Sequence, residues 1–181
     1  MIKRIIFLGA PGVGKGTMAG KLSHDKGFIH VSTGEIFRNE IKEETTLGKK
    51  IKQILASGAY VSDEVTNEVV AKTLDNENVK NSGYLLDGYP RTLDQAKFLD
   101  SISQVDKVVL LVADDNLVIS RLMSRGRKDD VLEVIEKRIK IYNDMTKPLI
   151  DYYRSKGILV EVDSSNGIDN NYQKLLSSLE F

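Results

Sequence analysis

The chain has 181 residues, and its 26 lysines and arginines balance 26 aspartates and glutamates, so the formal net charge is zero. This length fits one domain with a sizeable core, and the balanced charge argues against a general affinity for nucleic acid or for an acidic membrane. Cysteine is absent, which excludes disulfides, thiolate metal sites and a thiol nucleophile. The first residues lack the long apolar core of a signal peptide, and no stretch approaches a membrane span, so we expect a cytoplasmic protein.

The first predicted element is a buried parallel strand over residues 2–8, and a helix is predicted to begin near Thr17. Between them, Gly9, Gly12, Gly14 and Lys15 match the pattern G-x-x-x-x-G-K. In such a loop, backbone N–H groups and a helix N-terminus surround a phosphate while the lysine reaches its outer oxygens. A glycine cluster can also form a plain tight turn. The strand before it and the helix after it favour a phosphate-binding loop.

Four more apolar runs are predicted strands, at residues 28–32, 83–88, 107–113 and 157–163. Helical patterns separate the strands, which predicts an α/β fold with a five-stranded parallel sheet and helices on both faces. Three helical patterns follow the second strand, at residues 34–44, 47–58 and 62–77. Three helices are more than one connection between two parallel strands needs, so we expect part of this interval to project from the sheet as a small helical subdomain.

The third predicted strand ends at Asp87. A carboxylate at this position in a phosphate-binding-loop protein orients the waters of a phosphate-bound magnesium ion. The alternative is an aspartate that serves a turn or a helix cap. Arg91 follows across Gly88 and Pro90, so a rigid turn is expected to present a guanidinium at the same rim, where open parallel sheets bind ligands.

Four arginines follow the fourth predicted strand, at positions Arg121, Arg125, Arg127 and Arg138. The first two are four residues apart, and the last two are eleven residues apart, so each pair is predicted to share one face of a helix. The second of these helices is predicted from about Asp129 to Tyr153, with Pro148 bending or splitting it. Salt bridges to the acidic residues of segment 129–136 are the ordinary interpretation of such arginines. Arginine at all these positions and at Arg38 favours bidentate phosphate recognition.

Five segments, in order and over nearly the whole chain, resemble the adenylate kinase family. They are "GAPGVGKGT", "STGEIFR", "DGYPRT" with Gln95, "RLMSRGR", and the run from Arg127 through "RIKIYNDMTKPLIDYY". The resemblance implies a P-loop three-layer sandwich as a single domain over residues 1–181. It also implies the reversible reaction ATP + AMP ⇌ 2 ADP, with magnesium bound together with ATP. ATP, AMP and ADP would be the partners of a monomer that binds neither nucleic acid nor membrane.

The resemblance further implies a role for each motif residue. ATP would be bound by Gly12, Val13, Gly14, Lys15, Gly16, Thr17, Arg121, Arg125 and, through its backbone near the adenine, Asn166. AMP would be bound by Thr33, Arg38, Ala59, Tyr60, Val61, Gly88, Tyr89, Pro90, Arg91, Gln95, Arg127 and Arg138. The catalytic residues would be Lys15, Arg91, Arg127 and Arg138, and Asp87 would hold magnesium only through water.

Three departures from the family pattern affect what the resemblance implies. Met18 replaces the glutamine that usually follows the loop threonine, and Asn166 stands near the position of a lysine in many relatives. Only Gly126 separates Arg125 from Arg127, where long relatives insert a lid of a few dozen residues. We therefore expect a minimal lid at residues 125–127, Gly126 as the joint between two helices, and no zinc. Residues 32–61 would form the subdomain that binds the nucleoside monophosphate.

The proposed reaction needs no general base, because the attacking group is already a phosphate anion. His24 and His30 are therefore expected at the surface or in packing positions. The closest alternative is a uridylate or cytidylate kinase, but Thr33 and Gln95 favour adenylate. A switch that hydrolyses GTP would normally carry an N-K-x-D motif, which the sequence lacks. A non-catalytic nucleotide sensor would have little use for so many arginines directed at phosphate.

Overall fold

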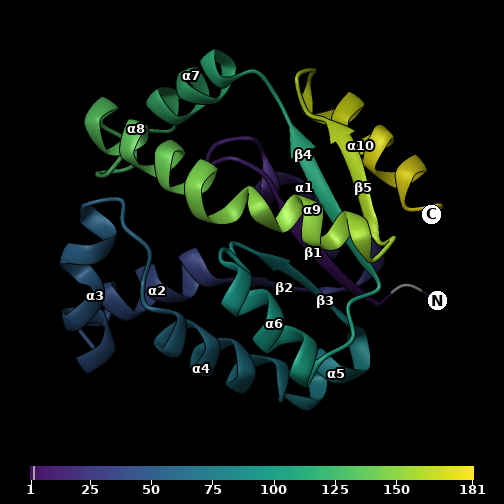
Figure 1. Cartoon of the computed structure of the whole chain (residues 1–181), viewed down its shortest axis with the longest axis horizontal. Coiled ribbons are helices and arrows are strands. Elements are labelled where there is room, and N and C mark those ends of the chain that lie inside the picture. The colour runs from purple at the N-terminus through teal and green to yellow at the C-terminus, as the bar shows by residue number, and fades with distance from the viewer. Residues whose placement is uncertain (2) are drawn as a thin grey trace.

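The computed structural model describes residues 1 and 3–181, and its centre is a parallel sheet of five strands (Figure 1). The strands are β1 (Arg4–Leu8), β2 (Ile29–Ser32), β3 (Tyr84–Asp87), β4 (Lys107–Val112) and β5 (Leu159–Asp163), in the spatial order β2-β3-β1-β4-β5. Each neighbouring pair is parallel, which confirms the predicted sheet. Ile2, which the first predicted strand included, lies outside the described residues.

Strand β1 lies in the middle of the sheet and pairs with β3 on one side and β4 on the other. Its residues are almost all apolar because both of its faces are covered. Successive side chains of a strand point to opposite faces, so Ile5 and Phe7 enter one core while Ile6 and Leu8 enter the other. The strand order reverses at β1, and ligands of open parallel sheets bind outside the carboxyl ends of the strands at such a point.

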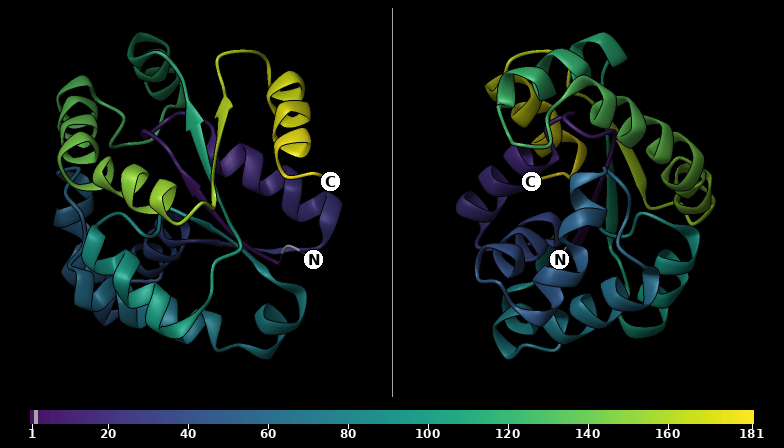
Figure 2. Two further views of the ribbon diagram at one scale, coloured as in Figure 1. Left: turned by 45° about the vertical axis from the view of Figure 1, so that its right-hand side comes forward. Right: turned by 90° about the vertical axis from the view of Figure 1, so that its left-hand side faces the viewer.

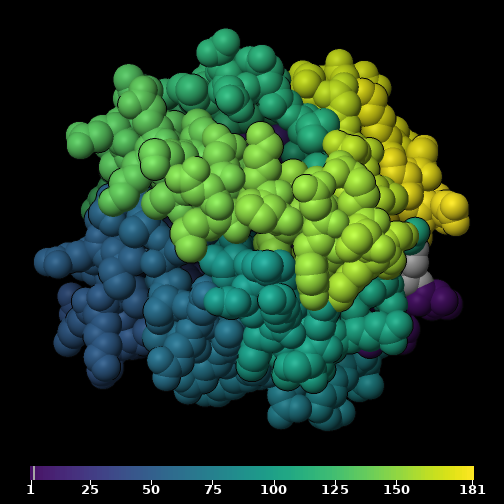
Figure 3. Space-filling model, in the orientation of Figure 1, coloured from purple at the N-terminus to yellow at the C-terminus, as the bar shows by residue number. Residues whose placement is uncertain are grey.

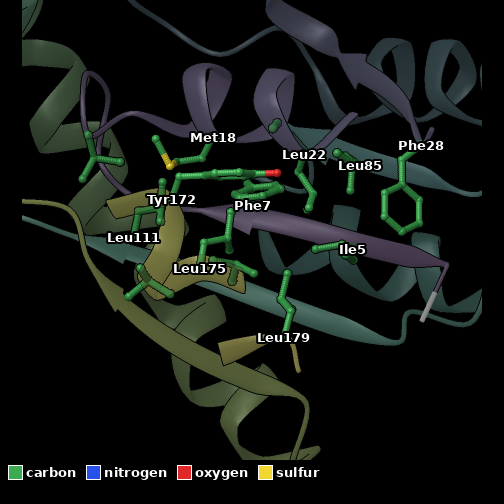
Figure 4. Close-up of a cluster of buried hydrophobic side chains, with 14 of the residues drawn as sticks. Ile5, Phe7, Met18, Leu22, Phe28, Leu85, Leu111, Tyr172, Leu175 and Leu179 are labelled. Atoms are coloured by element: carbon green, nitrogen blue, oxygen red, sulfur yellow. The ribbon is translucent and has the colours of Figure 1, made fainter. Parts of the chain in front are cut away.

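Helices cover both faces of the sheet, as Figure 2 shows. One face is covered by α1 (Lys15–Lys26) and α10 (Ile168–Ser178), and Figure 4 shows their side chains packed on β1. The other face is covered by α4 (Asp63–Leu74), α5 (Glu77–Ser82), α6 (Leu93–Ile102) and α9 (Pro148–Ser155). The three layers confirm the predicted α/β architecture.

Helices α2 (Thr33–Lys42) and α3 (Thr46–Ala56) pack on each other at the carboxyl edge of the sheet. Phe37, Ile51 and Val61 form a small hydrophobic cluster there, separate from the two cores that flank the sheet. The Ser32 hydroxyl caps α2 by accepting a hydrogen bond from the Glu35 backbone N–H. This segment therefore has a core of its own.

The segment that contains the arginine motifs differs from its prediction. Helix α7 (Asp115–Arg125) and helix α8 (Leu132–Ile141) are joined by residues 126–131, so Gly126 is not the only link between them. Arg127 lies in this connection and not on α8, and its expected place on one helix face with Arg138 is wrong. The reason is local, because the Asp130 carboxylate and backbone N–H both bond Arg127 and close a turn before the helix begins.

The predicted long helix that follows is three consecutive segments. After α8 the chain forms a π-helical turn, η1 (Tyr142–Thr146), and then α9, which has Pro148 in its first turn. The Lys147 backbone N–H donates to the carbonyl oxygen of Tyr142, five residues earlier. Proline has no N–H and its ring crowds the preceding turn, so the wider turn accommodates Pro148 without ending the helical path. The prediction that Pro148 bends or splits the helix is confirmed.

Within residues 1 and 3–181, no helix is both long enough and apolar enough to span a bilayer.

Candidate active site

A cleft of about 1450 Å³ opens at the carboxyl edge of the sheet, between the loop after β1, the segment α2–α3 and the segment α7–α8. Ten basic side chains line it against three acidic ones, although the whole chain has no net charge. The basic residues are Lys15, Arg38, Lys42, Lys52, Arg91, Arg121, Arg125, Arg127, Lys128 and Arg138. Pockets for one small ligand usually measure about 300–1000 Å³. The cleft therefore has the charge and the volume to hold more than one polyanion.

The glycine-rich loop connects β1 to α1 and forms the centre of the cleft. Gly12 has a φ of +79°, and a Cβ atom there would lie 2.5 Å from Cγ of Leu122, so no side chain fits between the loop and α7. Helix α1 begins without a side-chain cap and without an acidic residue in its first turn. Its N-terminal N–H groups and the positive end of its dipole are consequently available for an anion.

Lys15 is the first residue of α1, and its ammonium group folds back over the loop. Its Nζ donates to the carbonyl oxygens of Gly9 and Ala10 at 2.8 and 3.1 Å. Burial is the largest cause that lowers the pKa of Lys15 to about 8; the carboxylate of Asp87 opposes this shift, and the charges of nearby arginines add to it. A phosphate placed beside Nζ would restore the stability of the charged form. The ammonium is thus poised to bind an anion.

Arg121 on α7 and Ser164 directly after β5 hold the loop in place. Arg121 donates to the carbonyl oxygens of Val13 and Ser164 at 3.2 and 2.7 Å. The Ser164 hydroxyl also donates to the carbonyl oxygen of Val13. Sequence reasoning missed Ser164, although its place directly after a predicted strand, at the edge where ligands bind, was a usable signal.

A buried carboxylate organises the arginines of the α7–α8 connection. Asp130 has a fully buried side chain and accepts two hydrogen bonds from Arg125, at 2.8 and 2.5 Å. Its oxygens also accept the backbone N–H of Arg127 at 3.0 Å and lie 3.5 Å from the guanidinium of Arg138. The salt-bridge interpretation therefore holds for Arg125 and Arg138, which nevertheless line the cleft. Sequence reasoning did not predict that Asp130 would connect them.

Asp87, at the end of β3, lies beside the loop. A Cβ atom on Gly16 would lie 3.4 Å from its Oδ2, so the glycine after Lys15 leaves space next to the carboxylate. His30 lies 3.4 Å away on β2 and is only 18% exposed, a contact that its predicted packing role did not specify. Burial raises the pKa of Asp87, but the His30 contact and the charge of Lys15 outweigh it and hold the pKa below its ordinary value.

The donor set at Asp87 fits a magnesium ion that arrives with a phosphate. An ionised carboxylate with open space beside it offers the oxygen ligand that magnesium prefers. Within residues 1 and 3–181 no group of three His, Cys, Asp or Glu side chains could hold a metal ion.

The loop after β3 meets α2 on the other side of the cleft. Thr33 donates to the carbonyl oxygen of Gly88 at 2.9 Å, and the Arg91 Nε donates to the same oxygen at 2.8 Å. Gln95 is 1% exposed; its amide oxygen accepts the Arg91 N–H at 2.7 Å, and its amide nitrogen donates to Asp63 at 2.8 Å. The amide predicted to recognise a base therefore also holds Arg91 in place.

Tyr89 is the one predicted monophosphate-site residue that does not line the cleft. Its side chain is fully buried in the core under α4 and α6, and its hydroxyl donates to Asn67 at 2.7 Å. The neighbours Gly88 and Pro90 do line the cleft. The motif groups the three residues in sequence, but the aromatic ring turns toward the apolar core.

The remaining predicted residues come from four separate parts of the chain. Thr17, Arg38, Ala59, Tyr60, Val61 and Asn166 all line the cleft. The pKa of Arg38 is lowered by burial and by the positive charge of Arg127, and the carboxylates of Glu35 and Asp129 do not offset this shift. The carbonyl oxygen of Asn166 accepts a hydrogen bond from the Asn171 side chain at 2.8 Å, a partner that the sequence did not indicate.

Comparison with known proteins agrees with this geometry. The family model described as "Adenylate kinase" matches residues 7–158. An adenylate kinase of Prochlorococcus marinus is 43% identical over 185 residues, which cover 99% of this chain and 100% of the relative. An adenylate kinase of Mycoplasma mobile is 42% identical over 93% of this chain and 94% of its own length. One of Clavibacter michiganensis is 42% identical over 97% and 92%, respectively.

Proposed function

The chain belongs to the adenylate kinase family, and we propose that its cleft binds ATP and AMP side by side and transfers the terminal phosphoryl group directly between them. The reaction of the family is ATP + AMP ⇌ 2 ADP. The observation that carries the proposal is the convergence of ten basic side chains around the glycine-rich loop in a cleft of about 1450 Å³.

ATP is assigned to the half of the cleft formed by the glycine-rich loop. Backbone N–H groups from Gly12 to Thr17 surround its phosphates, and Arg121 and Arg125 lie on the same side. The adenine ring lies toward Asn166. Asp87 would hold magnesium through water, and a magnesium ion bound with ATP would supply charge neutralisation on the phosphates. The space beside Gly16 supports this role for Asp87.

AMP is assigned to the half formed by α2, by the segment Ala59 to Val61 and by the loop after β3. Arg38 and Arg91 bind its phosphate, and Thr33 and Gln95 select adenine. The lowered pKa of Arg38, caused by burial and by Arg127, supports an anion at this position, since a phosphate would relieve the repulsion. Arg127 and Arg138 complete the contacts from the opposite wall.

The chemistry consists of positioning and charge neutralisation. The AMP phosphate attacks in line, and no base is required because it is already an anion. Lys15, Arg91, Arg127 and Arg138 stabilise the charge that spreads over the transferring group in the transition state. The site must also keep water away, because water would accept the phosphoryl group and waste ATP.

Movement of a subdomain is the means that we propose for excluding water. Residues 32–61 form this monophosphate-binding subdomain. The buried residues of its hydrophobic cluster all come from this segment, although Val65 and Val69 of α4 pack against them, and this supports its movement as a unit. Residues 125–127 serve as the minimal lid, where α7 meets the connection 126–131, and Asp130 holds its arginines. The chain is further proposed to act as a monomer, because one chain supplies the lining of the cleft. We also propose a cytoplasmic location without a nucleic-acid or membrane partner.

The proposal is tested by measuring phosphoryl transfer from ATP with magnesium to AMP, CMP, UMP and GMP in separate reactions. We expect AMP to give the highest kcat/KM by at least about ten-fold, because a polar site left unpaired against the wrong base loses affinity. A preference for CMP or UMP would assign the chain to pyrimidine nucleotides. ATP cleavage without transfer to any monophosphate would contradict the proposed reaction.

A further inference from the structure

A tyrosine of the segment after α3 reaches across the cleft to the π-helical turn η1. The hydroxyl of Tyr60 lies 2.8 Å from Oγ1 of Thr146, and Oγ1 of Thr146 donates to the carbonyl oxygen of Arg91 at 2.7 Å. The guanidinium carbon of Arg91 lies 5.1 Å from the centre of the Tyr60 ring. Tyr60 therefore contacts Arg91 twice, through its ring and through Thr146.

The direction of these hydrogen bonds follows from the number of protons that each hydroxyl can donate. A threonine hydroxyl carries one proton, and Thr146 gives it to the carbonyl oxygen of Arg91. The proton between Tyr60 and Thr146 must then come from the tyrosine. When Tyr60 donates, the Thr146 hydroxyl is fixed with its proton aimed at Arg91, whereas without Tyr60 this hydroxyl can rotate.

The contact lies where the subdomain touches the rest of the molecule. Gly58, two residues before Tyr60, packs against α8 so closely that a Cβ atom would lie 2.9 Å from Cγ of Arg138 and 3.0 Å from Cγ1 of Val134. Figure 3 shows the blue segment of α3 meeting the light green segment of α8 on one face of the molecule. Separation of the two segments would withdraw Tyr60 from Thr146 and Arg91.

The position of Thr146 also suggests a role beyond packing. Thr146 is the last residue of a π-helical turn, is 5% exposed, and does not bond a carbonyl of its own helix. Pi-helical turns are rare and occur frequently at functional sites. Here the turn directs one buried hydroxyl toward two segments that are distant in the sequence.

We propose that Thr146 is a positioning residue that couples closure of the subdomain 32–61 to the placement of Arg91. Closure brings the ring of Tyr60 over the Arg91 guanidinium and fixes the Thr146 hydroxyl on the Arg91 carbonyl. Arg91 is then held from both ends only in the closed form. This inference rests on the proposed function, in which Arg91 binds the phosphate of AMP.

The test is a double-mutant cycle of Tyr60→Phe and Thr146→Val, measured by initial rates with AMP and ATP varied separately. Tyr60→Phe keeps the ring over Arg91, and Thr146→Val keeps the side-chain shape, so each removes one hydroxyl. We expect each single variant to lower kcat/KM for AMP by about three- to ten-fold, the equilibrium value of one hydrogen bond, and to change the KM for ATP by less than about two-fold. The kcat/KM for AMP of the double variant should be no lower than that of the less active single variant. Thr146→Ser, which keeps the hydroxyl, should have the wild-type kcat/KM.

Matched controls are Tyr152→Phe and Thr73→Val, whose hydroxyls bond Asp100 and the Val69 carbonyl and do not line the cleft. Both controls should keep wild-type kinetics. Losses that multiply in the double variant, equal losses for ATP and AMP, or failure of Thr146→Ser to restore activity would overturn the inference. If Thr146→Val does not fold, the comparison of Tyr60→Phe with Tyr152→Phe decides, and equal kinetics would overturn the inference. Inactivity of the wild-type chain would instead refute the proposed function.

Discussion

At the scale of single residues, Lys15 carries a charge that the free protein destabilises. Its pKa is about 8 because burial and nearby arginines oppose the ammonium form, while the carbonyl groups of Gly9 and Ala10 bind it. In the complex, the phosphates would reverse this balance. Such a charge is stabilised mainly when substrate phosphates are bound. It can therefore raise the reaction rate without stabilising the free folded protein.

Lys15→Met should therefore lower turnover and raise stability. We expect turnover to fall by about 100-fold or more, at least about 3 kcal/mol in the activation free energy. The folded-state pKa lies below the unfolded value, so the wild-type charge costs stability below about pH 8 and the cost disappears as the pH rises toward 10.5. After discounting for solvent screening, the variant should be about 1–2 kcal/mol more stable at pH 7, with a smaller difference at pH 10. Urea unfolding at both pH values measures this, and a less stable variant at pH 7 would contradict it.

Arg138 is predicted to affect turnover strongly and the free energy of unfolding only slightly. It is 20% exposed and lies 3.4 and 3.5 Å from Asp129 and Asp130, which are long distances for ion pairs. Removing an arginine that touches a transferring phosphoryl group costs about three to five decades in rate. Arg138→Ala should thus lower turnover by that range while changing the free energy of unfolding by at most about 1 kcal/mol. Steady-state rates and a melting curve on this variant check the prediction, and normal turnover would leave Arg138 as a salt-bridge residue only.

At the scale of elements, the connection between α7 and α8 depends on one carboxylate. Asp130 is buried, accepts two hydrogen bonds from Arg125 and one from the Arg127 backbone, and has no exposed side-chain surface. Burial raises its pKa, but the bonds from Arg125 and Arg127 outweigh this and lower the pKa below its ordinary value. The connection is therefore shaped by charge rather than by an apolar core.

Asp130→Asn should destabilise the protein in a pH-dependent way. At pH 7 we expect a loss of about 1–3 kcal/mol, since the guanidinium of Arg125 loses its charged partner. A carboxyl whose pKa is lowered by folding adds stability above its unfolded pKa, and this stability disappears as the pH falls through the folded pKa. The difference between wild type and variant should accordingly shrink below about pH 4. Unfolding curves at pH 7 and pH 3 measure it, and a difference of the same size at both would exclude a charge effect.

Elements with strong local signals could be predicted from the sequence. The apolar runs of β1 and β4 required burial on both faces, and the glycine spacing between β1 and α1 specified the loop. The predicted helix from Asp129 to Tyr153 was wrong in its start because the Asp130 turn is set by side-chain contacts that periodicity does not detect. The π-helical turn likewise depends on how Pro148 is accommodated, which sequence pattern alone leaves open.

At the scale of the whole molecule, the cleft depends on contacts between distant parts of the chain. Arg121 bonds the carbonyl of Val13 across 108 residues, and Ser164 bonds it across 151. The motifs predicted which residues would gather but not these partners, because long-range side-chain contacts have no periodic signature. Tyr89 shows the same limit, since only the packed core determines where its ring turns.

The same scale explains how a chain without net charge binds polyanions. Ten of its 26 basic residues line one cleft, from α1, α2, α3, the loop after β3 and the segment α7–α8, so the field acts locally. Two nucleotides can bind together in such a cleft only if separate groups of basic side chains neutralise the phosphates of each. Direct transfer between them, without release of phosphate to water, is therefore the central claim.

That claim is tested most directly by supplying ADP alone with magnesium and following the reaction by phosphorus NMR. We predict that ADP is converted into equal amounts of ATP and AMP, that no inorganic phosphate appears, and that Arg138→Ala slows the conversion by about three to five decades. Unchanged ADP with the wild-type protein, or the appearance of inorganic phosphate in place of ATP, would contradict direct transfer between two nucleotides bound in this cleft.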